Sequence, residues 1–153
     1  MNVKFFYFYA GFSQSALIAA YIHLQKLPGN RVPALQEILS IQEFKQGIPR
    51  DIGVPHFIGE DYRGDSVYTV AFGTNYELAL QTVNFILEKQ GLDLTKWHFI
   101  NAGELANNLW MKIGSLINDI FKISGLGKYL IAVGIRKNYQ QLCEQVSQFK
   151  KES

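Results

Sequence analysis

The sequence predicts a three-layer α/β domain, with a mostly parallel sheet of about five strands, one antiparallel hairpin, and helices on both faces. Three observations support this fold class. Segments of strand character alternate with amphipathic helical segments. The first strand has no polar interruption, as expected of a strand covered on both faces. A glycine-containing polar turn joins two short strands near the middle of the chain. At 153 residues, we expect one domain over residues 1–153.

The first strand and helix come from an unusual run, because residues 5–24 contain no Asp, Glu, Lys or Arg. Such a run could also be an export signal or a membrane span. The polar residues at 13–15 make a span improbable, and the strongly apolar segment after them does not fit a signal cleavage site. We therefore expect a strand over 3–10, a turn, and a helix over 15–27 that Pro28 and Gly29 end.

The central segment predicts a helix over 34–44 and a loop rich in proline and glycine over 45–55. A hairpin follows, with strands at 56–59 and 66–72. Gly64 in its turn, "EDYRGD", would take the positive-φ conformation that such a turn needs.

The C-terminal half is predicted to alternate between helices and strands. Apolar spacing predicts a helix from Asn75 to a cap at Gly91, a fourth strand over 96–101, and a long amphipathic helix over 102–123. The run "KYLIAVGI", residues 128–135, predicts a fifth strand, and residues 137–151 predict the last helix.

Composition excludes several classes of function. A formal charge of +2 without a basic stripe does not fit a nucleic-acid partner. The single cysteine, Cys143, allows no intrachain disulfide, so we expect a cytoplasmic protein, with Cys143 on the apolar stripe of the last helix. The three histidines have no metal-ligand spacing, and His23 and His98 are expected in the core or at an edge, with His56 exposed. We expect neither a metal nor a cofactor.

The turn after the first strand is the first candidate site. It opens a helix, so backbone N–H groups and the helix dipole would favour a phosphate or carboxylate there. The turn "AGFSQSA" matches neither the P-loop nor the dinucleotide-binding glycine pattern. A simple capped turn is the alternative. Asn101 and Glu104, after the fourth strand, would face this turn if strands one and four are neighbours.

The acidic turn at Glu60, Asp61 and Asp65 has two interpretations. Paired carboxylates can act as general acid and base. A solvated hairpin turn is the interpretation that we prefer.

Several stretches taken together resemble a known bacterial family. They are "YAGFSQSALIAAYIHLQKLP", "RVPALQEIL", "GDSVYTVAFG", "NNLWMKIG", "GKYLIAVGI" and "NYQQLCEQV". In this order they resemble the uncharacterised family called domain of unknown function 3189, over nearly the whole chain. The resemblance implies that the turn after the first strand is the chemical centre, and it implies no activity.

The chain departs from the family pattern within that turn, and so resembles a divergent member. Where the family has Gly-Gly-Thr-His-Ser-Ser, Gly11 and Ser15 match and Ser13 replaces threonine, but Phe12 replaces the second glycine and Gln14 the histidine. An amide cannot exchange a proton near neutral pH, so an acid or base role at that position would be lost.

A second stretch of the family pattern, similar to Gly-Arg-Pro, is "GKY" here, where Lys128 keeps a cation without the planar fork of arginine. The residues predicted to bind a ligand come from the turn after the first strand, from the end of the fourth strand and the start of its helix, and from this stretch: Gly11, Phe12, Ser13, Gln14, Ser15, Asn101, Glu104 and Lys128.

Two functions follow as expectations. The first is a non-catalytic or weakly catalytic protein of binding or assembly, as a homo-oligomer or beside a related subunit. It rests on the altered turn and on aromatic residues outside obvious core spacing: Tyr7, Tyr9, Phe12, Trp110 and Phe121. The alternative is a small enzyme or ligand-binding protein for a phosphorylated or carboxylated metabolite at the turn after the first strand. Whether the protein is an enzyme stays open at this point.

Overall fold

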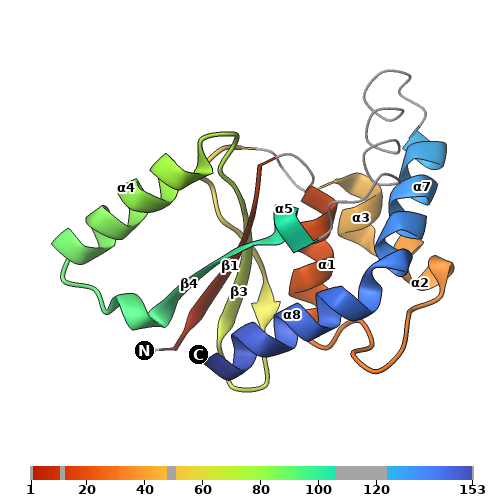
Figure 1. The fold of residues 1–153 in the computed structure, drawn as a ribbon, viewed down its shortest axis with the longest axis horizontal. Coiled ribbons are helices and arrows are strands. Elements are labelled where there is room, and N and C mark those ends of the chain that lie inside the picture. Colours follow the sequence, from red (N-terminus) through yellow and green to blue (C-terminus); the bar gives the residue numbers. More distant parts are fainter. Residues whose placement is uncertain (1, 11–12, 48–50, 106–123, 153) are drawn as a thin grey trace.

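The protein forms a four-stranded mixed sheet with helices against both faces, as a computed structural model shows (Figure 1). The structure describes residues 2–10, 13–47, 51–105 and 124–152. The strands are β1 (Lys4–Tyr9), β2 (His56–Glu60), β3 (Ser66–Ala71) and β4 (Trp97–Asn101). Their order in the sheet is β2-β3-β1-β4. β1 is parallel to β3 and to β4, and β2 is antiparallel to β3. The predicted fold class is confirmed.

Helices occupy the connections between the strands and the part of the chain after β4. They are α1 (Ser13–His23), α2 (Leu35–Leu39), α3 (Gln42–Gln46), α4 (Tyr76–Lys89), the 3-10 turn η1 (Leu94–Lys96), α5 (Ala102–Leu105), α7 (Ser124–Lys137) and α8 (Tyr139–Glu152). In Figure 1, α4 lies alone on one side of the sheet and the other labelled helices lie on the opposite side.

The main core lies on the α1 face of the sheet. Phe5, Tyr7 and Tyr9 project from β1 to this face and are almost fully buried. They pack with the apolar side of α1, which in turn contacts α8 and α5. Because α1 is covered on both sides, its sequence has no need of a charged face, which explains the uncharged run at 5–24.

The α4 face of the sheet carries a smaller, aromatic core. Phe6 and Phe8 of β1 are buried there with Val70 and Phe72. The ring of Phe6 stacks on Tyr68 at 4.9 Å and on Trp97 at 5.7 Å between centroids. β1 is therefore buried on both faces, by two cores of unequal size.

Two helix boundaries differ from the prediction. α1 ends at His23 rather than at Pro28, because Gln25 adopts a left-handed conformation with φ 57°. The N–H groups of Gln25 and Lys26 donate to the carbonyls of Ile22 and Tyr21, which is a Schellman cap. The helix predicted over 34–44 is instead two helices, α2 and α3, which an extended residue, Ile41, separates.

The fifth strand was predicted wrongly, because residues 128–135 belong to helix α7. Ile131, Ala132 and Ile135 are buried, at a spacing that one face of a helix produces. The long helix predicted over 102–123 begins as α5. Its residues 106–123 lie outside the described residues. None of the helices in the described ranges is long and apolar enough to cross a membrane.

Thr69 of β3 provides a test of the packing. Its side chain is fully buried between the sheet and α1, and among the described residues its hydroxyl has no hydrogen-bond partner. We expect Thr69→Val to raise the free energy of unfolding by about 1 kcal/mol, because valine has the same shape without the unpaired polar group. Urea denaturation measures this change, and a clear loss of stability would show that the hydroxyl is paired.

Candidate functional site

The carboxyl edge of the sheet is the candidate ligand site. The three parallel strands end there at Tyr9, Ala71 and Asn101. The chain passes from β1 to β3 through α1 on one face and from β3 to β4 through α4 on the other. β3 and β4 therefore lie on opposite sides of β1, so the direction in which the chain adds strands to the sheet reverses at β1. In open α/β sheets, ligands bind outside the carboxyl ends of the strands at such a reversal.

The turns after β1 and β4 lie together at this edge. β1 and β4 are neighbours, with Phe8 opposite Asn101, as the ligand hypothesis requires. The side-chain Oδ1 of Asn101 accepts a hydrogen bond of 3.1 Å from the N–H of Gly103. A Cβ at Gly103 would lie 4.0 Å from the backbone nitrogen of Ala10. A larger residue at 103 would therefore fill the space between the two turns.

The predicted site residues at the first turn are only partly described. Gly11 and Phe12 lie outside the described residues, as do the side chains of Ser13 and Glu104. α1 begins at Ser13 and α5 contains Glu104, so both backbones are at the carboxyl edge. Their role in ligand binding stays a prediction.

The other predicted residues occupy different environments. Gln14 is half-buried and Ser15 is buried in the first turn of α1. Lys128 lies in α7, and its Nζ donates to the backbone carbonyl of Lys45 in α3. The structure therefore places Lys128 on helix α7, and not at the start of a fifth strand.

A buried polar network lies at the opposite edge of the sheet, and the sequence did not predict it. His23, at the end of α1, is fully buried. Its Nδ1 is 2.8 Å from the hydroxyl of Tyr7, and its Nε2 is 3.5 Å from Oδ2 of Asp61. The carboxylate favours the proton on Nε2, so Nδ1 accepts the hydrogen bond that the Tyr7 hydroxyl donates.

The hairpin turn supplies the acidic part of this network. Oδ1 of Asp61 accepts hydrogen bonds from the N–H groups of Arg63, at 2.8 Å, and Asp65, at 3.1 Å. Oδ1 of Asp65 accepts a third, from the N–H of Val3, at 2.9 Å. Both carboxylates are thus bound to backbone groups. Our preferred interpretation of a solvated turn is wrong for Asp61 and Asp65, each 8% exposed, whereas Glu60 is exposed.

Two cations complete the network around Asp61. The Nζ of Lys150, in α8, lies 3.7 Å from Oδ2 of Asp61 and donates to the carbonyl of His23 at 3.0 Å. The Nε of Arg63 lies 3.6 Å from the same Oδ2 and 3.3 Å from Oδ2 of Asp65. The network therefore ties the last helix to α1 and to the hairpin.

The protonation states follow from burial and neighbouring charges. Burial, reinforced by the charge of Lys150, lowers the pKa of His23 to about 4, although Asp61 acts in the opposite direction. Burial acts to raise the pKa of Asp61, but the two backbone hydrogen bonds and Lys150 outweigh it, so this pKa is below its ordinary value. At neutral pH, His23 is neutral and Asp61 is charged.

The network therefore stabilises the fold and does not resemble a working catalytic site. His23 and Asp61 are closed off from solvent, so a substrate cannot reach them in this state. His23 in the core confirms its prediction. The ring of His98 stacks on the apolar ring of Phe5, with 5.2 Å between the ring centres. His56 is half-buried rather than exposed.

A groove of about 540 Å³ separates the segment at 29–31 from α8. Cys143 borders it, and burial raises the pKa of the thiol above its ordinary value, so this cysteine is a weak nucleophile. The predicted stripe is confirmed, because Tyr139, Leu142, Cys143 and Val146 are all buried. Within the part of the chain that the structure describes, no group of three His, Cys, Asp or Glu side chains could hold a metal ion.

The depressed pKa of His23 predicts how stability depends on pH. The unfolded chain binds a proton at His23 near pH 6.5 and the folded chain near 4. Folding is therefore favoured above pH 6.5, and about 3 kcal/mol is lost as the pH falls from 6.5 to 4. In His23→Gln this part of the pH dependence should disappear, whereas His56→Gln should keep it. Denaturant unfolding from pH 4 to 8 measures the slope, and an unchanged slope in His23→Gln would contradict the assignment.

Comparison with known proteins gives a family without an assigned activity. Neither a curated protein nor a solved structure matches the chain. The model of one family, described as "Protein of unknown function (DUF3189)", matches residues 4–151. This match spans both cores, the two turns at the carboxyl edge and the buried network, and the chain therefore belongs to the DUF3189 family.

Proposed function

We propose that this protein works in the bacterial cytoplasm as a binding and assembly protein, without catalysis as its main role, and that it self-associates through one apolar surface. We call this the α4 surface. It comprises the exposed apolar side chains of α4 and of the segment before and within β2: Ile52, Val54, Phe57, Leu78, Phe85 and Ile86. The exposure of α4 is the observation that carries the proposal.

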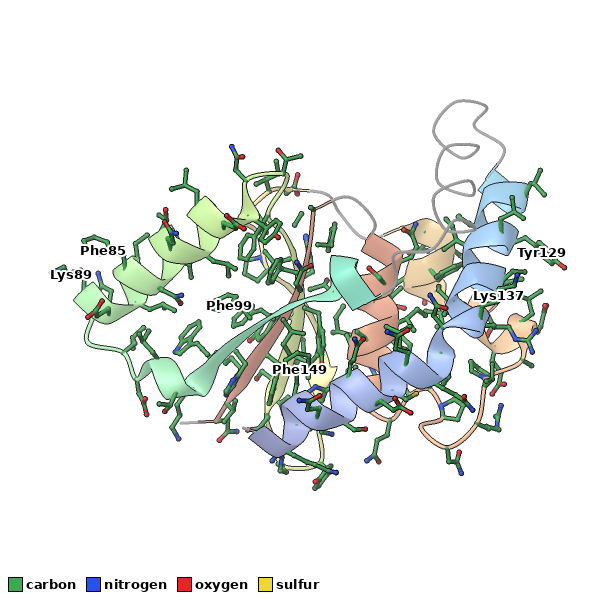
Figure 2. All side chains as sticks on the ribbon, viewed as in Figure 1. Phe85, Lys89, Phe99, Tyr129, Lys137 and Phe149 are labelled. Atoms are coloured by element: carbon green, nitrogen blue, oxygen red, sulfur yellow. The ribbon has the colours of Figure 1, made fainter. Side chains whose placement is uncertain are left out.

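α4 exposes apolar side chains on the side that faces away from the sheet. Leu80 and Val83 pack toward the aromatic core and Leu87 is buried. Leu78 and Phe85 are 63% and 58% exposed. Figure 2 shows Phe85 on the outer side of α4, whereas Phe99 projects from β4 into the space between the sheet and the helix. α4 is thus apolar on two sides, and a surface helix needs only one apolar side.

An apolar groove continues this surface toward β2. It has a volume of about 400 Å³ and lies between α4 and the segment at 52–53. Phe72 and Val83 form part of its lining, and Ile52 at its border is 72% exposed. Five of its large side chains, Ile52, Phe57, Leu78, Phe85 and Ile86, are more than half exposed, and large exposed apolar patches often mark interaction sites.

The two faces of the sheet explain why this surface is open. α1 is covered by α8 and α5, which form a second helical layer. Among the described residues, no helix covers the outer side of α4 in the same way. Burial of the α4 surface would stabilise the assembly at roughly 25 cal/mol for each Å² of apolar area removed from water.

The aromatic residues that the sequence suggested for an interaction surface do not form it. Tyr7 and Tyr9 are 0% and 2% exposed and belong to the main core, so that expectation was wrong. Phe12, Trp110 and Phe121 lie outside the described residues. Support for assembly now comes from the α4 surface.

Substitution of Leu78 tests the assembly. We expect light scattering to give at least twice the chain mass for the wild type, and Leu78→Glu to weaken association at least about tenfold, because the charge would be buried in the interface. Leu126→Glu is the matched control, since Leu126 is 49% exposed on α7, away from the α4 surface. A wild type that is monomeric at high concentration, or equal effects of the two variants, would contradict self-association through this surface.

We also propose a second function, the binding of a small phosphorylated or carboxylated ligand at the turns after β1 and β4. The reversal of winding beside β1 and the closeness of Ala10 to Gly103 support it. Backbone N–H groups at the start of α1 would favour an anion over a cation. Gln14, Ser15 and Asn101 are the predicted ligand residues at this edge whose side chains the structure describes.

Thermal unfolding with phosphate, sulfate and nucleotides tests the second function. A ligand at a hundred times its Kd should stabilise the protein by about 2.7 kcal/mol. The stabilisation should disappear in Gln14→Ala, which changes a half-buried side chain in the first turn of α1, and persist in Ser147→Ala, which changes an exposed serine of α8. If none of these anions shifts the unfolding temperature, the second function is wrong.

A further inference from the structure

We infer that the assembly is a two-fold dimer in which α4 packs antiparallel against α4 of a second copy of the chain. This inference rests on the proposed function, and it adds the identity of the partner and the geometry of the contact. It follows from the spacing, sizes and charges of the outer residues of α4.

The outer residues of α4 have the spacing of a helix–helix seam. Leu78, Thr82, Phe85 and Lys89 are all exposed and follow one another at i, i+4, i+7 and i+11. This alternation of four and three residues is the pattern that keeps one side of a helix against a partner helix. In Figure 2, Phe85 and Lys89 lie on the same outer side near the end of α4.

The seam is complementary in size when two copies run antiparallel. With Leu78 of one copy beside Lys89 of the other, the inner pair is Thr82 beside Phe85. A small side chain then faces a large one twice, through the two-fold axis. The hydroxyl of Thr82 donates to the carbonyl of Leu78 at 2.8 Å, so its burial leaves no donor unpaired.

The charges select the antiparallel direction. Glu77 and Lys89 are exposed at opposite ends of α4. In the antiparallel pair, Lys89 of each copy lies beside Glu77 of the other. In a parallel pair, Lys89 of one copy would meet Lys89 of the other in the seam, which is unfavourable. The Nζ of Lys89 also lies over the ring of Phe85, 5.4 Å from its centre.

The same arrangement covers the rest of the α4 surface. Ile86 is 51% exposed on the flank of the seam, and the groove between α4 and Ile52 adjoins Leu78 and Thr82. A second helix beside α4 would contact both. The partner thus supplies the outer layer that α8 and α5 supply on the opposite face.

Cysteine cross-linking tests this geometry in the full chain. In a Cys143→Ala background, we would mix an affinity-tagged Leu78→Cys variant with an untagged Lys89→Cys variant and oxidise them mildly. The mixture should give a cross-linked pair that contains both variants, because residues 78 and 89 face each other. Either variant alone should give little product, because its own cysteines would be about 16 Å apart along the helix, beyond the reach of a disulfide.

Charge exchange provides a second readout that needs no cysteine. Lys89→Glu should weaken the dimer several-fold, and Glu77→Lys added to the same chain should restore it. Efficient cross-linking of either variant alone, or failure of the double variant to restore association, would overturn the antiparallel pairing.

The light-scattering mass separates the two levels of the proposal. A dimer that forms no 78–89 cross-link would overturn this inference and leave self-association standing. A monomeric wild type would overturn both.

Discussion

The burial of β1 on both faces is the constraint on which the rest of the structure depends. β1 carries Phe5, Tyr7 and Tyr9 to one face and Phe6 and Phe8 to the other. Both sets of aromatic side chains must be removed from water, so the sheet needs a helical layer on each side. The layer on the α1 face is two helices deep, because α8 and α5 pack on α1. The layer on the other face is α4, whose outer side is apolar and exposed. The proposed dimer follows from this difference between the helical layers on the two faces of the sheet.

The buried network shows how the larger face is held together. Tyr7, His23, Asp61 and Lys150 come from β1, α1, the hairpin turn and α8, so four distant segments meet at one point. A neutral histidine next to a paired carboxylate avoids the large cost of an isolated buried charge. The network lies at the amino edge of the parallel strands, opposite the edge where ligands bind in such sheets. We therefore assign it to stability and leave the carboxyl edge for recognition.

Local patterns in the sequence predicted much of the fold, and long-range contacts decided what they missed. The first strand was predictable from its uninterrupted apolar run. The hairpin was predictable from its turn residue, Gly64, which has φ 81°, and α4 from its apolar period. The run 128–135 has strand-like residues, but a short apolar run does not distinguish a strand from a buried helix. The burial of Asp61 depends on Lys150, 89 positions later in the chain. No local pattern could reveal that contact.

The candidate site was predictable in place and not in chemistry. The turns after β1 and β4 do lie together, because β1 and β4 pair. Lys128 was assigned through a strand that is a helix, so its position could not follow from the sequence. The α4 surface could have been predicted from the sequence. Leu78 and Ile86 are apolar but fall outside the inward stripe of Leu80, Val83 and Leu87. Apolar residues beyond the inward face of a surface helix indicate a second contact.

Amide hydrogen exchange at two protein concentrations tests most directly whether a second copy completes the α4 layer. Association protects only those amides that are covered or stabilised in the complex. If the account is correct, the amides of α4 exchange more slowly at high concentration than at low concentration, while those of α1 and α8 exchange equally at both. Exchange of α4 that does not depend on concentration would contradict it.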